Sequence, residues 1–185
     1  MKPEHSYASL KTENIVASGK IADSLDIENI SSKLDTCTLD KKRFPGAVCR
    51  LTDPKIVALL FSSGKIVLTG IRSNDDFHRG LGVLTGQLGA LGAPLIDAPT
   101  VAITNMVCSY DTGKTINLTK MMLTFSLENI EYEPEQFPGL VYRLQEPHVV
   151  LLIFSSGKLI LTGAKNIEDV KAAIDQMMPK IIEIQ

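Results

Sequence analysis

The sequence predicts an α+β fold: two pseudo-symmetric repeats that form one curved antiparallel β-sheet, a saddle with helices on its convex face. A set of short motifs recurs once at a nearly constant spacing, and each copy carries the same order of strands and helices. In addition, the strands are apolar on both alternations, although each copy contains only enough helix to cover one face of a sheet.

The duplication is defined by motifs that recur with one offset. Phe-Pro-Gly starts at residues 44 and 137, Phe-Ser-Ser-Gly-Lys at 61 and 154, and Leu-Thr-Gly at 68 and 161, each pair 93 residues apart. An Asn-x-Val opening at Asn14 recurs 91 residues later at Asn105, so the second copy has two extra residues before its Phe-Pro-Gly. We expect an N-terminal tail over residues 1–12, one repeat over 13–98 and another over 99–185, linked near 92–100.

Each copy is predicted to contain a strand, a short helix, three further strands and a long helix. In the first copy the strands are expected at 15–21, 47–51, 56–61 and 66–69, and the second copy begins with a strand at 101–109. The short helix of the first copy would carry Ile27, Ile30 and Leu34 on one face. The long helices have apolar stripes at helical spacing: Phe77, Leu81, Leu84, Leu88 and Leu91 in the first copy, and Val170, Ile174, Met177 and Ile181 in the second.

The first long helix is unusually rich in glycine. Each glycine costs a helix interior about 1 kcal/mol relative to alanine. Close packing of two symmetry-related helices is one explanation. The glycines are Gly80, Gly82, Gly86, Gly89 and Gly92.

Composition excludes several classes of protein. Of the 185 residues, 44% are hydrophobic, which is enough for a core. No apolar run approaches the roughly 20 residues of a membrane span, and the polar start, Met1 to Thr12, does not resemble a signal peptide. We therefore expect a soluble, intracellular protein. The net charge of −2 is unlike a generic nucleic-acid binder, but where the charges lie matters more than their sum.

The cysteines and histidines indicate no metal site. Cys37, Cys49 and Cys108 form no CxxC pair, so we expect neither a zinc site nor a disulfide framework, and predict reduced, mostly buried thiols. None of the three histidines lies near a carboxylate or cysteine at ligand spacing. No cofactor is expected either.

One face of the sheet has no helix to cover it. Residues 56–61 and 149–154 are continuous apolar runs, which are typical of a sheet buried on both faces. Either the second face packs on another sheet, or it binds something large that tolerates apolar contact. Phe61 and Phe154 end these runs just before a tight turn, and Phe44 and Phe137 precede a Pro-Gly. In a hairpin meander each pair can meet at one edge of the sheet, although a core position is the ordinary explanation for a single phenylalanine.

Basic and hydroxyl residues recur on the strands and turns rather than on the long helices. A lone lysine after Ser-Gly usually marks a solvated turn, but a symmetric set around an apolar sheet suits the phosphate backbones on either side of a groove. The matched pairs are Arg50 with Arg143, Lys65 with Lys158, Arg72 with Lys165 and Ser63 with Ser156.

These motifs resemble the TATA-box-binding protein family, and the match covers nearly the whole chain from Asn14 onward. The strongest single stretch is Tyr-Glu-Pro-Glu-Gln-Phe-Pro-Gly, residues 132–139. The short N-terminus and low charge resemble archaeal members. The resemblance implies a general transcription initiation factor, not an enzyme, that is cytoplasmic and nucleoid-associated in an archaeon, or nuclear in a eukaryote. It would bind and bend A·T-rich promoter DNA through the minor groove and recruit transcription factor B and RNA polymerase.

The resemblance also implies residue roles. Phe44 with Phe61, and Phe137 with Phe154, would wedge between base steps, and Asn14 and Asn105 would hydrogen-bond to minor-groove acceptors at the site's centre. Glu133 and Glu135 would form the edge that docks transcription factor B. The apolar floor would be Val16, Leu59, Val67, Val107, Leu152 and Ile160, with Thr69 and Thr162 adding hydrogen bonds. Phosphates would be held by Arg50, Ser63, Lys65, Arg143, Ser156 and Lys158, and more weakly by Arg43, Arg72 and Lys165.

The physics of the minor groove is consistent with these roles. A·T pairs present only acceptors there, whereas G·C pairs add a donor that an apolar floor leaves unpaired. Flexible TA steps lower the cost of deforming the duplex. The family is itself a standard example of minor-groove wedging.

Three departures from the family pattern matter. The helix at 75–91 has Arg79 as its one basic residue, so we expect no partner of the kind that meets a basic helix in eukaryotic relatives. Gln136 replaces an apolar residue beside the factor B contact, so that interface would differ. Because Gln136 is also the counterpart of Arg43, the grip on phosphate should be asymmetric.

Two alternatives remain open at this point. A duplicated small-molecule or enzyme domain has no titratable pair at catalytic spacing, and the acidic pairs at 75–76 and 168–169 are typical of helix starts. A pocket between sheet and helices would favour it. A divergent family member could instead act as a transcription-factor adaptor that grips DNA weakly. An apolar open face also suggests a homodimer without DNA.

Overall fold

The computed structural model describes residues 5–125 and 127–185. The chain forms two compact units. The first-repeat unit comprises residues 14–104, and the second-repeat unit comprises residues 105–185 together with the described residues before Asn14.

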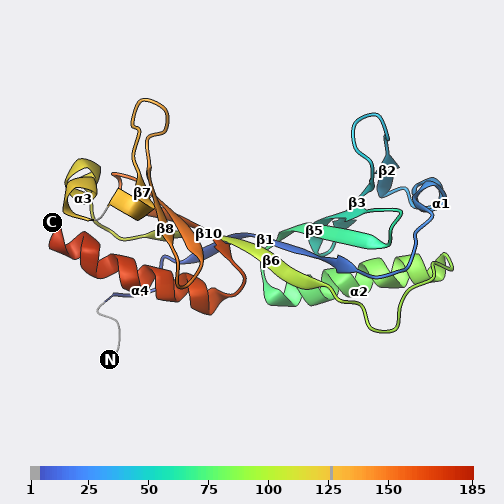
Figure 1. The fold of residues 1–185 in the computed structure, drawn as a ribbon. Helices are drawn as coiled ribbons and strands as arrows, with labels where there is room; N and C mark the ends of the chain where they lie inside the picture. Colours follow the sequence, from blue (N-terminus) through green and yellow to red (C-terminus); the bar gives the residue numbers. More distant parts are fainter. Residues whose placement is uncertain (1–4, 126) are drawn as a thin grey trace. The chain divides into compact units, whose positions relative to one another are not determined.

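The first-repeat unit pairs an antiparallel sheet with two helices. Its strands lie in the order β2-β3-β4-β5-β1, so β2 is an edge strand. The long helix lies along one side of these strands, and the loop between β2 and β3 projects on the other side (Figure 1). In chain order the elements are β1 (Lys11–Lys20), α1 (Ile27–Lys33), β2 (Cys37–Leu39), β3 (Ala47–Thr52), β4 (Lys55–Leu60), β5 (Lys65–Ile71) and α2 (Asn74–Ala90).

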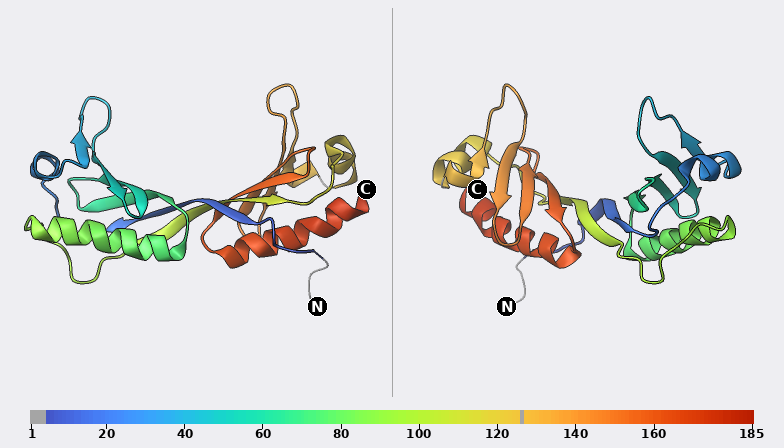
Figure 2. Two further views of the ribbon diagram at one scale, coloured as in Figure 1. Left: turned by 180° about the vertical axis from the view of Figure 1, so that it is seen from behind. Right: turned by 45° about the vertical axis from the view of Figure 1, so that its right-hand side comes forward.

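The second-repeat unit has the same plan, with strand order β6-β10-β9-β8-β7. Its long helix lies beneath the strands in the same way, as both views of Figure 2 show. The elements are β6 (Ala102–Asp111), α3 (Leu118–Thr124), the short 3₁₀ helix η1 (Leu127–Asn129), β7 (Ile130–Glu131), β8 (Leu140–Leu144), β9 (Val149–Ile153), β10 (Lys158–Ala164) and α4 (Ile167–Glu183).

Alternation along the strands builds the core of each unit. On β4, Ile56, Ala58 and Leu60 are buried while the residues between them are partly exposed. These side chains face the apolar stripe of α2, where Leu84 and Leu88 are fully buried. One face of the sheet is therefore core, as expected for a sheet covered by helix on one side.

The helix starts follow the predicted capping chemistry. Ser73 accepts a hydrogen bond from the backbone N–H of Asp76, and Asn166 accepts one from Asp169. A side-chain oxygen at this position satisfies a backbone donor that has no partner within the helix, and carboxylates in the first turn complement the helix dipole. The two acidic pairs therefore serve helix initiation.

Close packing explains one of the α2 glycines. A Cβ on Gly80 would lie 2.4 Å from Cδ1 of Ile56, so α2 lies close to β4 of its own unit and alanine here would require the end of the Ile56 side chain to move. The expected packing on a symmetry-related helix is not needed to explain this residue. A Cβ on Gly82 or Gly86 would have nothing within 4 Å, and the structure gives no packing reason for these two glycines.

The residues before Asn14 are bound to the second-repeat unit. The hydroxyl of Tyr110 donates to the carbonyl of Ser6 (3.0 Å), and Ser9 Oγ donates to the carbonyl of Asp111 (2.7 Å). Tyr7 donates its hydroxyl proton to Asp175. Desolvation and this hydrogen bond raise the pKa of Tyr7 to about 12.

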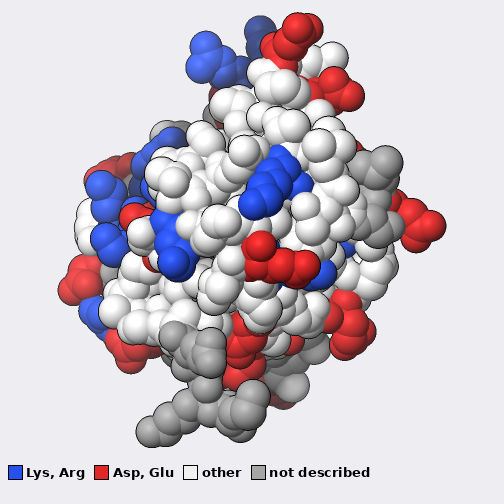
Figure 3. All heavy atoms as spheres, turned by 90° about the vertical axis from the view of Figure 1, so that its left-hand side faces the viewer, with Lys and Arg blue, Asp and Glu red and all other residues white. Residues whose placement is uncertain are grey.

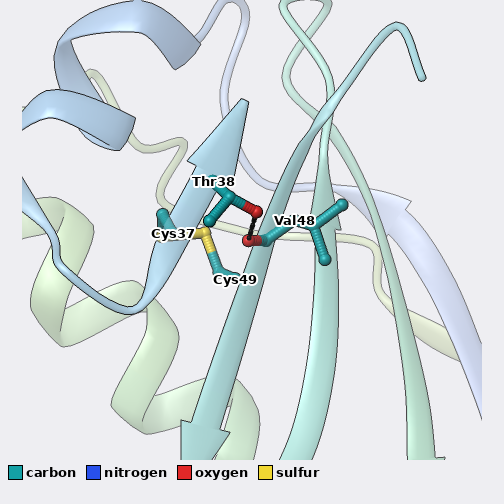
Figure 4. Close-up of a disulfide and its surroundings, with 4 residues drawn as sticks. All are labelled: Cys37, Thr38, Val48 and Cys49. Atoms are coloured by element: carbon teal, nitrogen blue, oxygen red, sulfur yellow. Dashed lines mark hydrogen bonds between the residues drawn. A yellow bond between two sulfur atoms is a disulfide. The ribbon is translucent and has the colours of Figure 1, made fainter. Parts of the chain in front are cut away.

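Two short edge strands, β2 and β7, were absent from the elements predicted by sequence, and one of them corrects the cysteine prediction. Cys37 on β2 lies in register with Cys49 on β3, and the two form a disulfide (Figure 4). The expectation of three reduced thiols is therefore wrong for this pair, whereas Cys108 is free and buried. No spacing motif marks the pair, because their proximity depends on a three-residue strand. The same register pair in the second repeat is Ile130 and Tyr142.

Removing this disulfide is expected to destabilise the protein. The bridge closes a loop with a sequence separation of 12 residues. For a loop of this size the combined change Cys37→Ser and Cys49→Ser should lower the free energy of unfolding by about 3 kcal/mol. Denaturant titrations with and without dithiothreitol measure the effect. The wild type should lose stability on reduction and the variant should not respond; equal stability of oxidised and reduced wild type would contradict the prediction.

No helix within the described residues is long and apolar enough to cross a membrane.

Candidate nucleic-acid interface

In each unit the face of the sheet opposite the long helix carries apolar side chains that are only partly buried. On β5, for example, Val67 and Thr69 are partly exposed, whereas their neighbours Ile66 and Leu68 are fully buried. We call this side of each sheet the uncovered face. Its predicted apolar members all have intermediate exposure: Val16, Leu59, Val67, Val107, Leu152 and Ile160.

Sequence reasoning missed four apolar residues of the uncovered face. Val57 lies between buried residues of β4 and is the register partner of Thr69. Strict alternation from the predicted Leu59 would have found Val57. Val48 on β3 and Val141 on β8 could be assigned to this face only from the strand register, which pairs them with Leu59 and Leu152. The four residues are Val48, Val57, Val141 and Val150.

The four motif phenylalanines form two aromatic pairs. The ring centroids of Phe44 and Phe61 lie 5.6 Å apart at an interplanar angle of 62°, and those of Phe137 and Phe154 lie 5.8 Å apart at 66°. Both are edge-to-face geometries that aromatic rings favour. None of the four is buried, and Phe137 is 36% exposed. The pairs therefore do not pack beneath the long helices.

The glycine of each Phe-Pro-Gly motif makes room for its aromatic pair. A Cβ on Gly46 would lie 2.8 Å from Cε1 of Phe44 and 3.2 Å from Cε1 of Phe61. Gly139 has the same relation to its own pair, at 2.7 Å and 3.1 Å. The small glycine thus lets the two phenylalanine rings of each pair pack against each other, and any larger residue at this position would push them apart.

Each asparagine of the uncovered face has its amide orientation fixed. Oδ1 of Asn14 accepts a hydrogen bond from the backbone N–H of Gly70 at 2.8 Å, and Oδ1 of Asn105 accepts one from Gly163 at 2.7 Å. Because a backbone N–H can only donate, the oxygen must point toward it. The Nδ2 group then lies near a threonine hydroxyl, at 3.3 Å from Thr69 and 3.4 Å in the second repeat. An amide NH₂ has two protons, so one remains available to an acceptor in front of the sheet.

The Leu-Thr-Gly motifs supply this arrangement. Gly70 and Gly163 have φ angles of +83° and +93°, which glycine adopts without the steric cost that a side chain would add. Both lie where the register with the neighbouring strand is interrupted. The irregularity turns a backbone N–H away from the strand ladder and toward the asparagine.

The predicted phosphate-holding residues are all exposed, and in each repeat an arginine lies near a carboxylate. Nε of Arg143 lies 3.5 Å from Glu131 Oε1, and Nε of Arg43 lies 3.8 Å from Asp40. Exposed pairs of this kind contribute little to stability. The exposed set comprises Arg43, Arg50, Ser63, Lys65, Arg72, Arg143, Ser156, Lys158 and Lys165.

The loop between β7 and β8 is acidic. Glu133 and Glu135 are exposed on it, and the Glu133 carbonyl accepts hydrogen bonds from the backbone of Gln136 and Phe137. Figure 3 looks at the second-repeat unit from the side of α3 and shows acidic side chains on this projecting loop. A polypeptide partner with basic residues would be complementary to it.

Two shallow hollows of about 400 and 440 Å³ lie beside α1 and beside the N-terminal segment, and neither is lined by α2 or α4, so neither is the pocket between sheet and helices that would favour an enzyme. Within residues 5–125 and 127–185 no group of three or more His, Cys, Asp or Glu could hold a metal ion.

The geometry defines a class of protein: a duplicated α+β chain whose candidate binding site is a strand surface rather than a cleft. The chain belongs to the TATA-binding protein family, because the family model described as "Transcription factor TFIID (or TATA-binding protein, TBP)" matches residues 9–89 and 100–184. The two matched segments correspond to the two repeats.

Individual relatives agree. The chain is 46% identical over 176 residues to the TATA-box-binding protein of Haloarcula marismortui, with 95% of each chain covered. It is 45% identical over 170 residues to TATA-box-binding protein 1 of Methanosarcina acetivorans, covering 92% of this chain and 93% of that one. The solved structure of Methanococcus jannaschii TBP matches with a TM-score of 0.84 at 42% identity, covering 95% of this chain and 99% of that chain.

These comparisons confirm the family resemblance and the fold class predicted from sequence. The family is one of DNA-binding transcription factors, and nothing in the comparisons indicates catalysis.

Proposed function

We propose that this chain initiates transcription by binding the minor groove of A·T-rich promoter DNA with its uncovered faces. The two aromatic pairs would wedge between base steps at the ends of the site and bend the duplex. Amide protons of Asn14 and Asn105 would reach minor-groove acceptors, and exposed cations would hold phosphates. The observation that carries the proposal is the combination, in both repeats, of a partly exposed aromatic pair and an amide donor of fixed orientation.

The chemistry of this surface matches the minor groove. Apolar side chains leave the guanine amino group without a partner, and a fixed amide donor meets acceptors at A·T pairs. Aromatic rings between base steps unstack and kink a duplex, and the bend brings more protein into contact with DNA.

We further propose that the acidic loop with Glu133 and Glu135 recruits transcription factor B, and through it RNA polymerase. The support is the exposure of both carboxylates beside an aromatic pair, where a partner could contact the loop while DNA occupies the strands. An adaptor that grips DNA weakly is the alternative, which the net charge of −2 favours.

Measuring duplex binding at several salt concentrations distinguishes promoter binding from the adaptor alternative. With about six phosphate contacts, the logarithm of the association constant should fall against the logarithm of salt with a slope near −5. Fluorescence anisotropy with an A·T-rich duplex, and a G·C-rich duplex as control, measures this slope. Weak, salt-independent binding to both duplexes would support the adaptor instead.

A further inference from the structure

The two repeats carry very different charge on equivalent segments. Residues 40–72 run from the loop before β3 to the end of β5 and hold seven Lys or Arg and two Asp or Glu. The equivalent segment, 133–165, holds three Lys or Arg and three Asp or Glu. The long helices lie outside both segments, so the difference falls on the strands and loops that form the candidate interface.

The first contrast is at the end of the first strand of each repeat. Lys20 is the register partner of Lys65, whereas its counterpart Asp111 is the register partner of Lys158. Register partners project from the same side of a sheet. Two cations thus stand together at this corner of the first repeat, and a carboxylate stands beside the cation in the second. The ammonium of Lys20 is 3.2 Å from Asp23, but its side chain is 49% exposed.

The second contrast is at the edge strands. Glu131 on β7 approaches the guanidinium of Arg143 (3.5 Å). Its counterpart on β2 is Thr38, which pairs with Val48 just as Glu131 pairs with Val141. The equivalent arginine of the first repeat, Arg50, therefore has an uncharged neighbour at this position.

The third contrast is in the projecting loops. The first loop reads Asp-Lys-Lys-Arg over residues 40–43, and the second reads Glu-Pro-Glu-Gln over 133–136. Lys42 and its counterpart Glu135 are both exposed. The exchanges Lys20/Asp111, Thr38/Glu131 and Lys42/Glu135 have the same sign, because each makes the second repeat less attractive to a polyanion, whereas the neighbouring exchange Asp23/Lys114 has the opposite sign.

We propose that the first repeat supplies most of the electrostatic hold on the DNA backbone, with Lys20 as a phosphate-gripping residue that the second repeat lacks. Asp111 and Glu131 weaken the grip of the second repeat by partly neutralising Lys158 and Arg143. At physiological salt the Debye length is about 8 Å, so a charge on a neighbouring strand still acts on the same phosphate. The inference rests on the proposed DNA binding and assigns a separate role to each repeat.

Charge-neutralising substitutions of matched residues test the proposal. Lys20→Gln should weaken binding to an A·T-rich duplex about 2- to 5-fold at 0.1 M salt and reduce the magnitude of the log–log salt slope by about 0.9. Asp111→Asn and Glu131→Gln should each tighten binding by about 2- to 5-fold, because each removes a repelling charge near the backbone. Asparagine at 111 keeps the side-chain oxygen that accepts from Gly113. Lys33→Gln, on the exposed surface of α1, is the control and should leave affinity and slope unchanged.

The outcomes distinguish this inference from the proposed function. If the wild type shows no salt-dependent duplex binding, the proposed function itself fails. If the wild type binds with a steep slope but Lys20→Gln changes nothing, or Asp111→Asn weakens binding as Lys20→Gln does, the asymmetry alone is refuted. Thermal melts by circular dichroism verify that each variant is folded.

Discussion

Phe154→Ala is expected to remove most of the bend at one end of a bound A·T-rich duplex while the protein stays folded. The Phe154 ring is partly exposed and rests on Phe137, so in the free protein the substitution loses mainly one aromatic contact, worth about 0.5–1.5 kcal/mol. In the complex it would lose a buried side chain worth about 1.5–3 kcal/mol. Affinity should therefore fall by roughly 10- to 100-fold. Fluorescence energy transfer across an end-labelled duplex measures the bend.

A surface aromatic in the same unit provides the control. Phe125 caps the end of α3 and lies under the ammonium of Lys180, and it is not a member of the aromatic pair. Phe125→Ala should leave both bend and affinity unchanged. Unfolding of Phe154→Ala would show that this ring belongs to the core, and a normal bend in the folded variant would show that it is not a wedge.

The duplication made much of the fold predictable from sequence. Each motif occurs twice, so an element weakly indicated in one copy is supported by the other, as for the strands ending at Phe61 and Phe154. The motif positions also follow from local physics. Gly46 must be small to admit an aromatic pair, and Gly70 must adopt a positive φ to direct its N–H at Asn14. Because only glycine meets these requirements, the Phe-Pro-Gly and Leu-Thr-Gly motifs occur in both copies and can be recognised in the sequence.

What escaped prediction depends on pairing between strands. The disulfide requires β2, a strand of three residues that has too few positions for an alternation pattern. Val48 and Val141 join the uncovered face only once the register of β3 and β8 is known. The contrast between Lys20 and Asp111 also depends on register, because neither residue lies in a repeated motif. Sequence reasoning therefore predicted part of the uncovered face and missed the neighbours that strand register places beside it.

Asn105→Ala should erode the preference for A·T over G·C at the centre of the site. The amide of Asn105 is held with its NH₂ group turned away from Gly163, so it would donate to minor-groove acceptors and be repelled by the guanine amino group. One hydrogen bond contributes about 0.5–1.5 kcal/mol, so discrimination at the central base pairs should fall by up to about tenfold. Competition binding with duplexes that carry single A·T-to-G·C changes measures the loss position by position.

Asn105→Asp separates base recognition from local structure. A carboxylate at this position can still accept from the Gly163 N–H, so the fold around β10 keeps its hydrogen bond. It has no proton to give, however, and it places a negative charge against minor-groove acceptors and phosphates. We expect Asn105→Asp to bind DNA more weakly than Asn105→Ala while unfolding at a temperature closer to that of the wild type. If the aspartate variant instead binds as tightly as the wild type, the donor role of Asn105 must be abandoned, because the local structure would then be all that this residue provides.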